Sequence, residues 1–199
     1  MFEAHSALAA VLPSSGRDGA DGRRCLSLGE APLGSLLQIG VYPGCAALVA
    51  AAAPALLGGA LAESTVVAGS PAGHLSFRIA ADQYWIRTRS VDLAARLRAG
   101  LSDRAASVTV LDGSRSCIVI DGPAARSLLG RLVAIDVEPT VFGVGHFAQV
   151  PIHHVGGLLY RAGPQRYEFI ALRTFAASTF EVIEDAALFY GYDPLREQS

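Results

Sequence analysis

The stretch SVTVLDGSRSCIVIDG, residues 107–122, contains the strongest short turn signal in the chain and decides the interpretation of the fold. Two runs rich in β-branched residues flank Asp112-Gly113, a pair that favours the tight turn between antiparallel strands. We therefore expect a β-hairpin over these residues. A helix is predicted directly after it, because Pro123 stands at the first helical position, where proline loses no hydrogen bond.

The predicted elements on either side of this stretch alternate between strands and helices. Their order, βαββαβ followed by βαβββα, matches a ferredoxin-like unit in its first half and approaches it in the second. The sequence therefore predicts an α+β fold in which helices pack on mixed or antiparallel sheets. Further strands are expected over residues 33–41, 74–80, 82–88, 145–152, 156–162 and 166–172, and helices over residues 45–62, 91–101, 123–136 and 175–190.

The polar and glycine-rich residues 13–24 are typical of a flexible segment. We place a flexible polar leader over residues 1–30 and a single domain over residues 31–199. A further division of this domain into two half-units, residues 31–112 and 113–199, stays open, since no sequence repeat supports a duplication.

The overall composition points to burial against a partner. Hydrophobic residues make up 51% of the chain and charged residues 17%, so the surface has to be unusually apolar, and soluble monomers rarely expose large apolar patches. The net charge of −2 gives no electrostatic footprint for nucleic acid. All sixteen basic residues are arginine, which excludes mechanisms that need a lysine, such as a Schiff base or a P-loop.

The cysteines and the apolar segments favour a cytoplasmic protein without membrane contact. Cys25, Cys45 and Cys117 are far apart, so neither a disulfide framework nor a zinc site is expected. The first residues lack the basic region of a signal peptide. Residues 45–62 have the length of a membrane span, but Pro54 interrupts them and no arginine flanks them closely, so we expect a packed internal helix.

Three of the five histidines lie in VFGVGHFAQVPIHHVGGLLY, residues 141–160. The letters GVGHFA match a dinucleotide fingerprint, but Pro151 would break the helix that such a loop requires. His153 and His154 are adjacent in a predicted strand and should point to opposite faces, so at most one of them can join His146. Two histidines fall short of the usual zinc set, and we interpret the stretch as two strands joined by turns.

The other reactive side chains are equally isolated. Ser114 and Ser116 lie near Asp112 but lack the G-x-S-x-G turn that exposes a nucleophile. Cys117 is predicted inside an apolar strand, where a thiol is usually inert. No group combines a nucleophile, a base and an oxyanion donor, so the sequence predicts no catalytic, cofactor-binding or metal-binding residue.

Several segments, taken in order, resemble the gamma subunit of heterotetrameric sarcosine oxidase, and the resemblance spans about residues 33–191. That family has a Pro-Ala-Ala-Arg helix start, a Leu-Asp-x-x-Pro turn, a Phe-x-x-Gly-x-x-Ala-Gln segment and an Arg-Ser-Phe-Ala opening of the last helix. The matching segments here are residues 123–126, 135–139, 142–149 and 173–176. Val133, Val150 and Thr174 depart from the residues that are frequent in the family, namely cysteine, threonine and serine.

The resemblance implies a fold like the folate-binding region of the glycine-cleavage T-protein and a non-catalytic, structural role in an oxidoreductase complex. It implies partners as well: an alpha subunit with NAD and a tetrahydrofolate-binding domain, a beta subunit with FAD and FMN, and a delta subunit with zinc. The complex would oxidise sarcosine to glycine, pass the methyl carbon to tetrahydrofolate or release it as formaldehyde, and form hydrogen peroxide. Trp85, Arg173 and Phe175 are then candidate interface or structural positions.

Three other interpretations stay open. The chain could be a gamma-type subunit of a related complex that oxidises N-methylglutamate or hydroxyproline. It could be a stand-alone folate-binding module like an aminomethyltransferase, although such proteins usually carry a lysine-containing segment that this chain lacks. It could also be a small enzyme with a metal held by His146 and His153.

Overall fold

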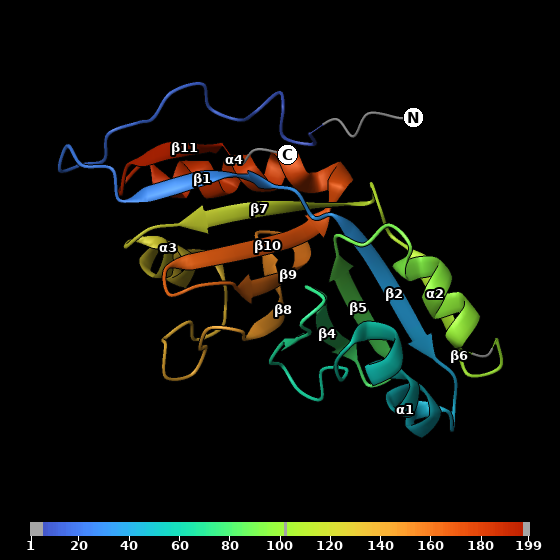
Figure 1. Cartoon of the computed structure of the whole chain (residues 1–199). Helices are drawn as coiled ribbons and strands as arrows, with labels where there is room; N and C mark the ends of the chain where they lie inside the picture. The colour runs from blue at the N-terminus through green and yellow to red at the C-terminus, as the bar shows by residue number, and fades with distance from the viewer. Residues whose placement is uncertain (1–5, 102, 197–199) are drawn as a thin grey trace. The chain divides into compact units, whose positions relative to one another are not determined.

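The computed structural model describes residues 6–101 and 103–196 (Figure 1). The chain folds into two compact units. Unit 1 combines Met1–Pro32 with Gly113–Ser199, and unit 2 is Leu33–Asp112. Each unit has its own sheet and its own helices, and each is described separately below.

Unit 2 is a five-stranded antiparallel sheet with two helices, and its strands lie side by side in the order β3-β4-β5-β2-β6. β2 and β4 both pair antiparallel with β5, so they are parallel to each other, and the connection between them contains α1 and the short strand β3. β5 and β6 both pair antiparallel with β2, and α2 connects them. This split βαβ arrangement confirms the predicted ferredoxin-like order of the first half. The elements are β2 (Ser35–Val41), α1 (Ala46–Leu57), β3 (Ala68–Gly69), β4 (Leu75–Ala80), β5 (Gln83–Thr88), α2 (Leu93–Gly100) and β6 (Ala106–Val110).

The core of unit 2 lies between one face of this sheet and the two helices. Leu37 and Ile39 on β2 are buried in the same apolar cluster as Leu93 and Leu97 on α2. Side chains alternate between the two faces of a strand, so Gln38 and its neighbours in the register, Trp85 among them, belong to the face opposite the helices.

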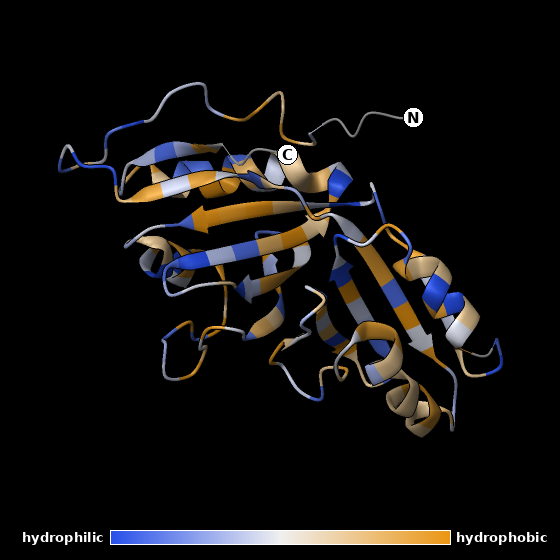
Figure 2. Cartoon of the chain, in the orientation of Figure 1, coloured by the Kyte–Doolittle hydropathy of each residue, from blue (hydrophilic) through white to orange (hydrophobic). Residues whose placement is uncertain are grey.

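The helix α1 is apolar on every side, as Figure 2 shows by its lack of strongly hydrophilic positions. Val49, Ala53 and Leu57 pack into the core of unit 2, whereas Leu48 is 65% exposed. The prediction of a packed helix is therefore correct for one stripe of α1. Among the described residues, no helix combines the length and the apolar character needed to cross a membrane.

Unit 1 is a six-stranded sheet in the order β11-β1-β7-β10-β9-β8. All neighbours are antiparallel except β1 and β11, which are parallel, so the sheet is mixed as predicted. The elements are β1 (Leu26–Ala31), β7 (Arg115–Asp121), α3 (Ala125–Leu132), β8 (Phe147–Ile152), β9 (Val155–Arg161), β10 (Arg166–Leu172), the 3-10 turn η1 (Arg173–Phe175), α4 (Ala176–Ala187) and β11 (Tyr192–Arg196).

One face of the unit 1 sheet forms a single apolar core with α3 and α4. Ile118 on β7 and Phe169 on β10 are fully buried, together with Leu128 on α3 and Phe180 on α4. Burying side chains of this size contributes about 1.5–3 kcal/mol each. The core therefore fixes α4, and with it the residues at both ends of that helix.

The predicted hairpin over residues 107–122 is wrong. Asp112 and Gly113 do form a turn, and Gly113 takes the left-handed φ of 73°. The two strands that flank the turn, β6 and β7, belong to different sheets, since β6 pairs with β2 and β7 pairs with β1 and β10. The Asp112 carboxylate accepts a 2.8 Å hydrogen bond from the Leu36 amide, which holds the end of β6 in unit 2.

Residues 6–24 form turns with little regular structure, and they pack on unit 1. Leu8 is fully buried in the core of this unit. Arg17 and Tyr192 exchange two backbone hydrogen bonds of 2.8 Å each, which extends the pairing beside β11. The division into a leader over residues 1–30 and a domain over residues 31–199, with half-units 31–112 and 113–199, stays a prediction.

Tyr192, the first residue of β11, makes the stability of the fold decrease at alkaline pH. Its side chain is fully buried, and its hydroxyl donates a hydrogen bond to the carboxylate of Glu184 on α4. Burial, together with the nearby Glu184 carboxylate, raises the pKa of Tyr192 from 10.0 to about 12. At a pH between 10 and about 12, the folded chain therefore keeps the proton of the Tyr192 hydroxyl, whereas the unfolded chain has largely lost it.

We expect the free energy of unfolding to fall by about 2 kcal/mol as the pH rises from 10 to about 12. The stabilisation from Tyr192 is complete below pH 10 and is lost as the pH passes the pKa of the folded state. Lysine is absent, so the tyrosines are the side chains that titrate in this range. Urea unfolding at several pH values measures the effect, and Tyr192→Phe is the control that should remove most of it. An unchanged alkaline loss in that variant would contradict the assignment.

Candidate functional site

Trp85 lies in the middle of β5, on the face of the unit 2 sheet opposite the helices. The indole is partly buried, and its Nε1–H donates a 3.1 Å hydrogen bond to Oε1 of Gln38 on the neighbouring strand. Phe77 on β4 is its partner in the register on the other side, and it is fully buried. Trp85 therefore has a satisfied polar group and apolar neighbours within its own sheet, as a structural position requires.

Arg173 and Phe175 lie in η1, the short turn that joins β10 to α4. The Arg173 amide donates a 3.0 Å hydrogen bond to the Ser114 carbonyl, which anchors the turn beside the start of β7. Phe175 is the N-cap residue of α4, and its side chain is 48% exposed. Aromatic side chains such as phenylalanine are enriched in protein–protein interfaces relative to the rest of the surface.

The structure corrects the prediction for two histidines of the 141–160 stretch. His153 and His154 are not part of a strand: they form the two-residue turn between β8 and β9, which Ile152 and Val155 close as a pair. His153 has a φ of 55°, and the two imidazole rings lie on the same side with their centroids 3.8 Å apart. Both side chains are exposed.

The third histidine of the stretch, His146, lies away from this turn. Its ring packs edge-on against Phe142, with 6.0 Å between the centroids, and its backbone pairs with Arg161. Between residues 6 and 196, with position 102 left aside, no three His, Cys, Asp or Glu side chains gather closely enough to hold a metal ion. The GVGHFA segment leads into β8, so it does not begin a helix.

The two candidate nucleophiles on β7, Ser116 and Cys117, are both buried. Cys117 is fully buried within the strand. Ser116 is 2% exposed, and its hydroxyl donates a 2.6 Å hydrogen bond to the carboxylate of Glu30 on β1. This carboxylate also accepts a hydrogen bond from the Ser6 hydroxyl, so its two oxygens join the N-terminal residues to the sheet.

The buried arginine on β9 was not among the residues that the sequence pattern singled out. Arg161 is 6% exposed, and its guanidinium donates 2.7 Å hydrogen bonds to the carbonyls of Phe142 and Pro164 and a longer one of 3.4 Å to Gly163. Its charge also lies 5.5 Å from the ring centroid of Tyr167. Arg161 therefore holds the loop that contains His146 and the turn that precedes β10.

Tyr167 is 1% exposed, and its hydroxyl is a buried polar group without a hydrogen-bond partner among the described residues. An unsatisfied buried hydroxyl costs about 1–3 kcal/mol. We therefore expect Tyr167→Phe to raise the free energy of unfolding by about 1 kcal/mol, measured as a higher midpoint in urea. Tyr190→Phe, at a partly buried position on the same unit, is the matched control with little expected change. A loss of stability in Tyr167→Phe would mean that the hydroxyl binds an ordered water molecule.

A small pocket of about 160 Å³ lies in unit 2 beside the start of α1. It is smaller than the clefts of about 300 Å³ or more that bind small molecules in most proteins. Asp82 is the one charged residue of its lining, which also includes Tyr42, Tyr84 and Val49.

Three curated proteins are similar to this chain over most of its length, and each is called sarcosine oxidase subunit gamma. The protein from Corynebacterium sp. (strain P-1) is 30% identical over 161 residues, which cover 79% of each chain. The one from Arthrobacter sp. is 30% identical over 75% of this chain and 74% of its own, and the one from Corynebacterium sp. (strain U-96) is 27% identical over 83% and 80%. The chain belongs to the sarcosine oxidase gamma subunit family. No family model matches the sequence.

Solved structures agree with this gamma subunit assignment at the level of the fold. A chain of the heterotetrameric sarcosine oxidase from Corynebacterium sp. U-96, in complex with pyrrole 2-carboxylate, superposes with a TM-score of 0.81 at 24% identity and covers 98% of both chains. The aminomethyltransferase T of the glycine cleavage system from Bartonella henselae gives a TM-score of 0.53 at 14% identity, over 87% of this chain and 48% of that one. The predicted likeness of the gamma subunit fold to the T-protein is confirmed.

Proposed function

We propose that this chain is the gamma subunit of a heterotetrameric, flavin-dependent sarcosine oxidase, in which it stabilises the assembly and carries out no step of the reaction. The observation that carries the proposal is the family relationship, which extends over about four fifths of this chain and of its relatives. The apolar composition supports it, since an unusually apolar surface is favourable where partner subunits cover it.

The chemistry of such a complex belongs to the other subunits. We infer that an alpha subunit supplies NAD and the tetrahydrofolate site, a beta subunit supplies FAD and FMN, and a delta subunit holds zinc. A flavin of such a complex would accept two electrons from sarcosine, and oxygen would take them up to give hydrogen peroxide. The methyl carbon leaves as formaldehyde after hydrolysis or passes to tetrahydrofolate, and glycine is the product.

We further propose that Arg173 and Phe175 mark a contact with a partner subunit, and that Trp85 supports the sheet of unit 2. The exposed Phe175 ring favours the first proposal. The hydrogen bond between the Trp85 indole and Gln38 favours the second, because it already satisfies the polar group of the ring.

The test is a mild affinity purification of the full chain from its own host, followed by size exclusion with an absorbance spectrum. We expect a large yellow complex with flavin bands that forms glycine and hydrogen peroxide from sarcosine. Parallel assays with N-methylglutamate and hydroxyproline identify the substrate. If either of these replaces sarcosine, the gamma-type role stands and the substrate is wrong. Recovery of the chain from its host only as a colourless monomer, without partner subunits, would overturn the proposal.

A further inference from the structure

The outer face of α4 and the turn after it expose an unusual combination of side chains. On the inner side, Ala176, Phe180 and Ile183 pack into the core of unit 1. Five outward residues have a helical spacing of three or four, and Phe189 follows them in the turn after the helix. Together they form what we call the α4 surface: Phe175, Ser178, Glu181, Asp185, Leu188 and Phe189. Along α4, Figure 2 shows hydrophobic and strongly hydrophilic positions side by side.

Large apolar side chains lie at both ends of the α4 surface. Phe175 is 48% exposed at the start of the helix, and Leu188 and Phe189 are 41% and 61% exposed just after its end. The twelve residues of α4 separate the two ends, which corresponds to about 18 Å of helical rise. Exposed aromatic side chains at both ends of a helix of this length fit within a protein interface of ordinary size.

Two carboxylates lie between Phe175 and Phe189 at positions where a negative charge destabilises a helix. Glu181 and Asp185 are one turn apart, where two like charges repel each other. Asp185 also lies in the last turn of α4, where the helix dipole disfavours a negative charge and where no basic residue is present. Both side chains are exposed, and residues 174–190 contain no arginine to balance them.

We propose that the α4 surface docks on a partner subunit of the oxidase that presents basic side chains between two apolar hollows. The hollows would receive Phe175 at one end and Phe189 at the other, and the basic side chains would neutralise Glu181 and Asp185. Charge complementarity selects this partner over a second copy of the chain, since a second α4 surface would bring carboxylates against carboxylates. The inference rests on the proposed function, and the α4 surface is the part of the chain that would bind the partner subunit.

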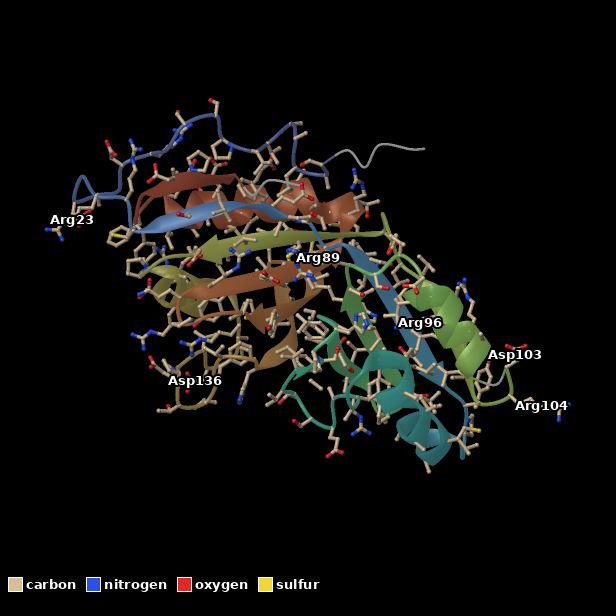
Figure 3. The ribbon with its side chains drawn as sticks, viewed as in Figure 1. Arg23, Arg89, Arg96, Asp103, Arg104 and Asp136 are labelled. Atoms are coloured by element: carbon tan, nitrogen blue, oxygen red, sulfur yellow. The ribbon has the colours of Figure 1, made fainter. Side chains whose placement is uncertain are left out.

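The experiment compares assembly of the wild-type full chain and of variants co-expressed with the partner subunits. Glu181→Arg combined with Asp185→Arg should weaken association with the tagged partner at least about tenfold, and Phe175→Ala combined with Phe189→Ala should do the same. For the wild type, association should weaken as the salt concentration rises. The control is Glu63→Arg combined with Asp103→Arg, an equal change of charge at exposed positions of unit 2 (Figure 3 labels Asp103), which should leave association unchanged.

A folding defect is distinguished from a docking defect by thermal unfolding of each isolated variant. The charge reversal exchanges one pair of like charges for another, but it replaces a negative charge in the last turn of α4 with a positive one that the helix dipole favours, so its melting temperature should equal or exceed that of the wild type. Normal association of both α4 variants would overturn the inference while leaving the subunit role intact. Failure of the wild type to join any flavin-containing partner would overturn the proposed function instead. A dimer of the chain that the charge reversal dissociates would also overturn the inference, because a second copy would then be the occupant.

Discussion

Replacing Gly191 with alanine is expected to lower the free energy of unfolding by about 2–5 kcal/mol. Gly191 precedes β11 with a φ of 67°, a conformation that costs an alanine about 1–2 kcal/mol. A Cβ at this position would lie 2.1 Å from the carbonyl oxygen of Arg23 and 2.4 Å from the amide nitrogen of Gly19. Both atoms are backbone, so the N-terminal segment has to move away, which adds a cost of about 1–3 kcal/mol.

Urea unfolding of Gly191→Ala measures this loss, and Gly130→Ala is the matched control. Gly130 lies in α3, and a Cβ there would meet no atom within 4 Å. Alanine is a better helix former than glycine, so the control should gain about 0.5–1 kcal/mol. Equal stabilities of the two variants would mean that residues 17–25 do not hold this position in solution.

The second large effect is expected for Arg161→Met, which should lower the free energy of unfolding by about 2–4 kcal/mol. Methionine retains the apolar stem of the arginine, but the carbonyls of Phe142 and Pro164 lose their 2.7 Å donors. Each buried carbonyl without a partner costs about 1–3 kcal/mol. The segment around His146 should then exchange its amide hydrogens faster, which hydrogen-exchange mass spectrometry detects.

The control for this variant is Arg131→Met, an exposed arginine in the last turn of α3 whose loss should cost less than about 1 kcal/mol. Local exchange around His146 should not change in it. An Arg161→Met protein as stable as the control would mean that water replaces the guanidinium. Other contacts would then hold the loop that contains His146.

Most of the fold could be predicted from local patterns. The strands over residues 145–152, 156–162 and 166–172 appear as β8, β9 and β10, and the last helix appears as α4. Their apolar residues alternate or repeat with the period of the element, and periodicity is visible in a single sequence. The candidate interface residue Phe175 was placed by family resemblance, and its exposure could be known only from the structure.

The features that the sequence did not predict depend on contacts between distant residues. Asp112-Gly113 signals a turn but cannot say which partner each flanking strand takes, and here the partners are in different sheets. His153 and His154 were expected in a strand, because histidine at a left-handed turn position has no strong local signal. The burial of Arg161 could not be predicted, because it depends on the backbone carbonyls that accept its hydrogen bonds, and the Phe142 carbonyl is 19 residues away in the sequence.

The parallel pair of β1 and β11 has a consequence for the order in which the protein is made. Unit 2 is continuous in the sequence, so all of its strands have left the ribosome once residue 112 has emerged. Unit 1 needs β1 and also β11, which lies more than 160 residues later in the chain, and β1 stands in the sheet between β11 and β7. Until residue 196 has emerged, the parallel edge of β1 lacks its neighbouring strand, and Glu184 on α4 lacks the Tyr192 hydroxyl. A partner that binds unit 1 through α4 would therefore favour chains in which β11 is already in place.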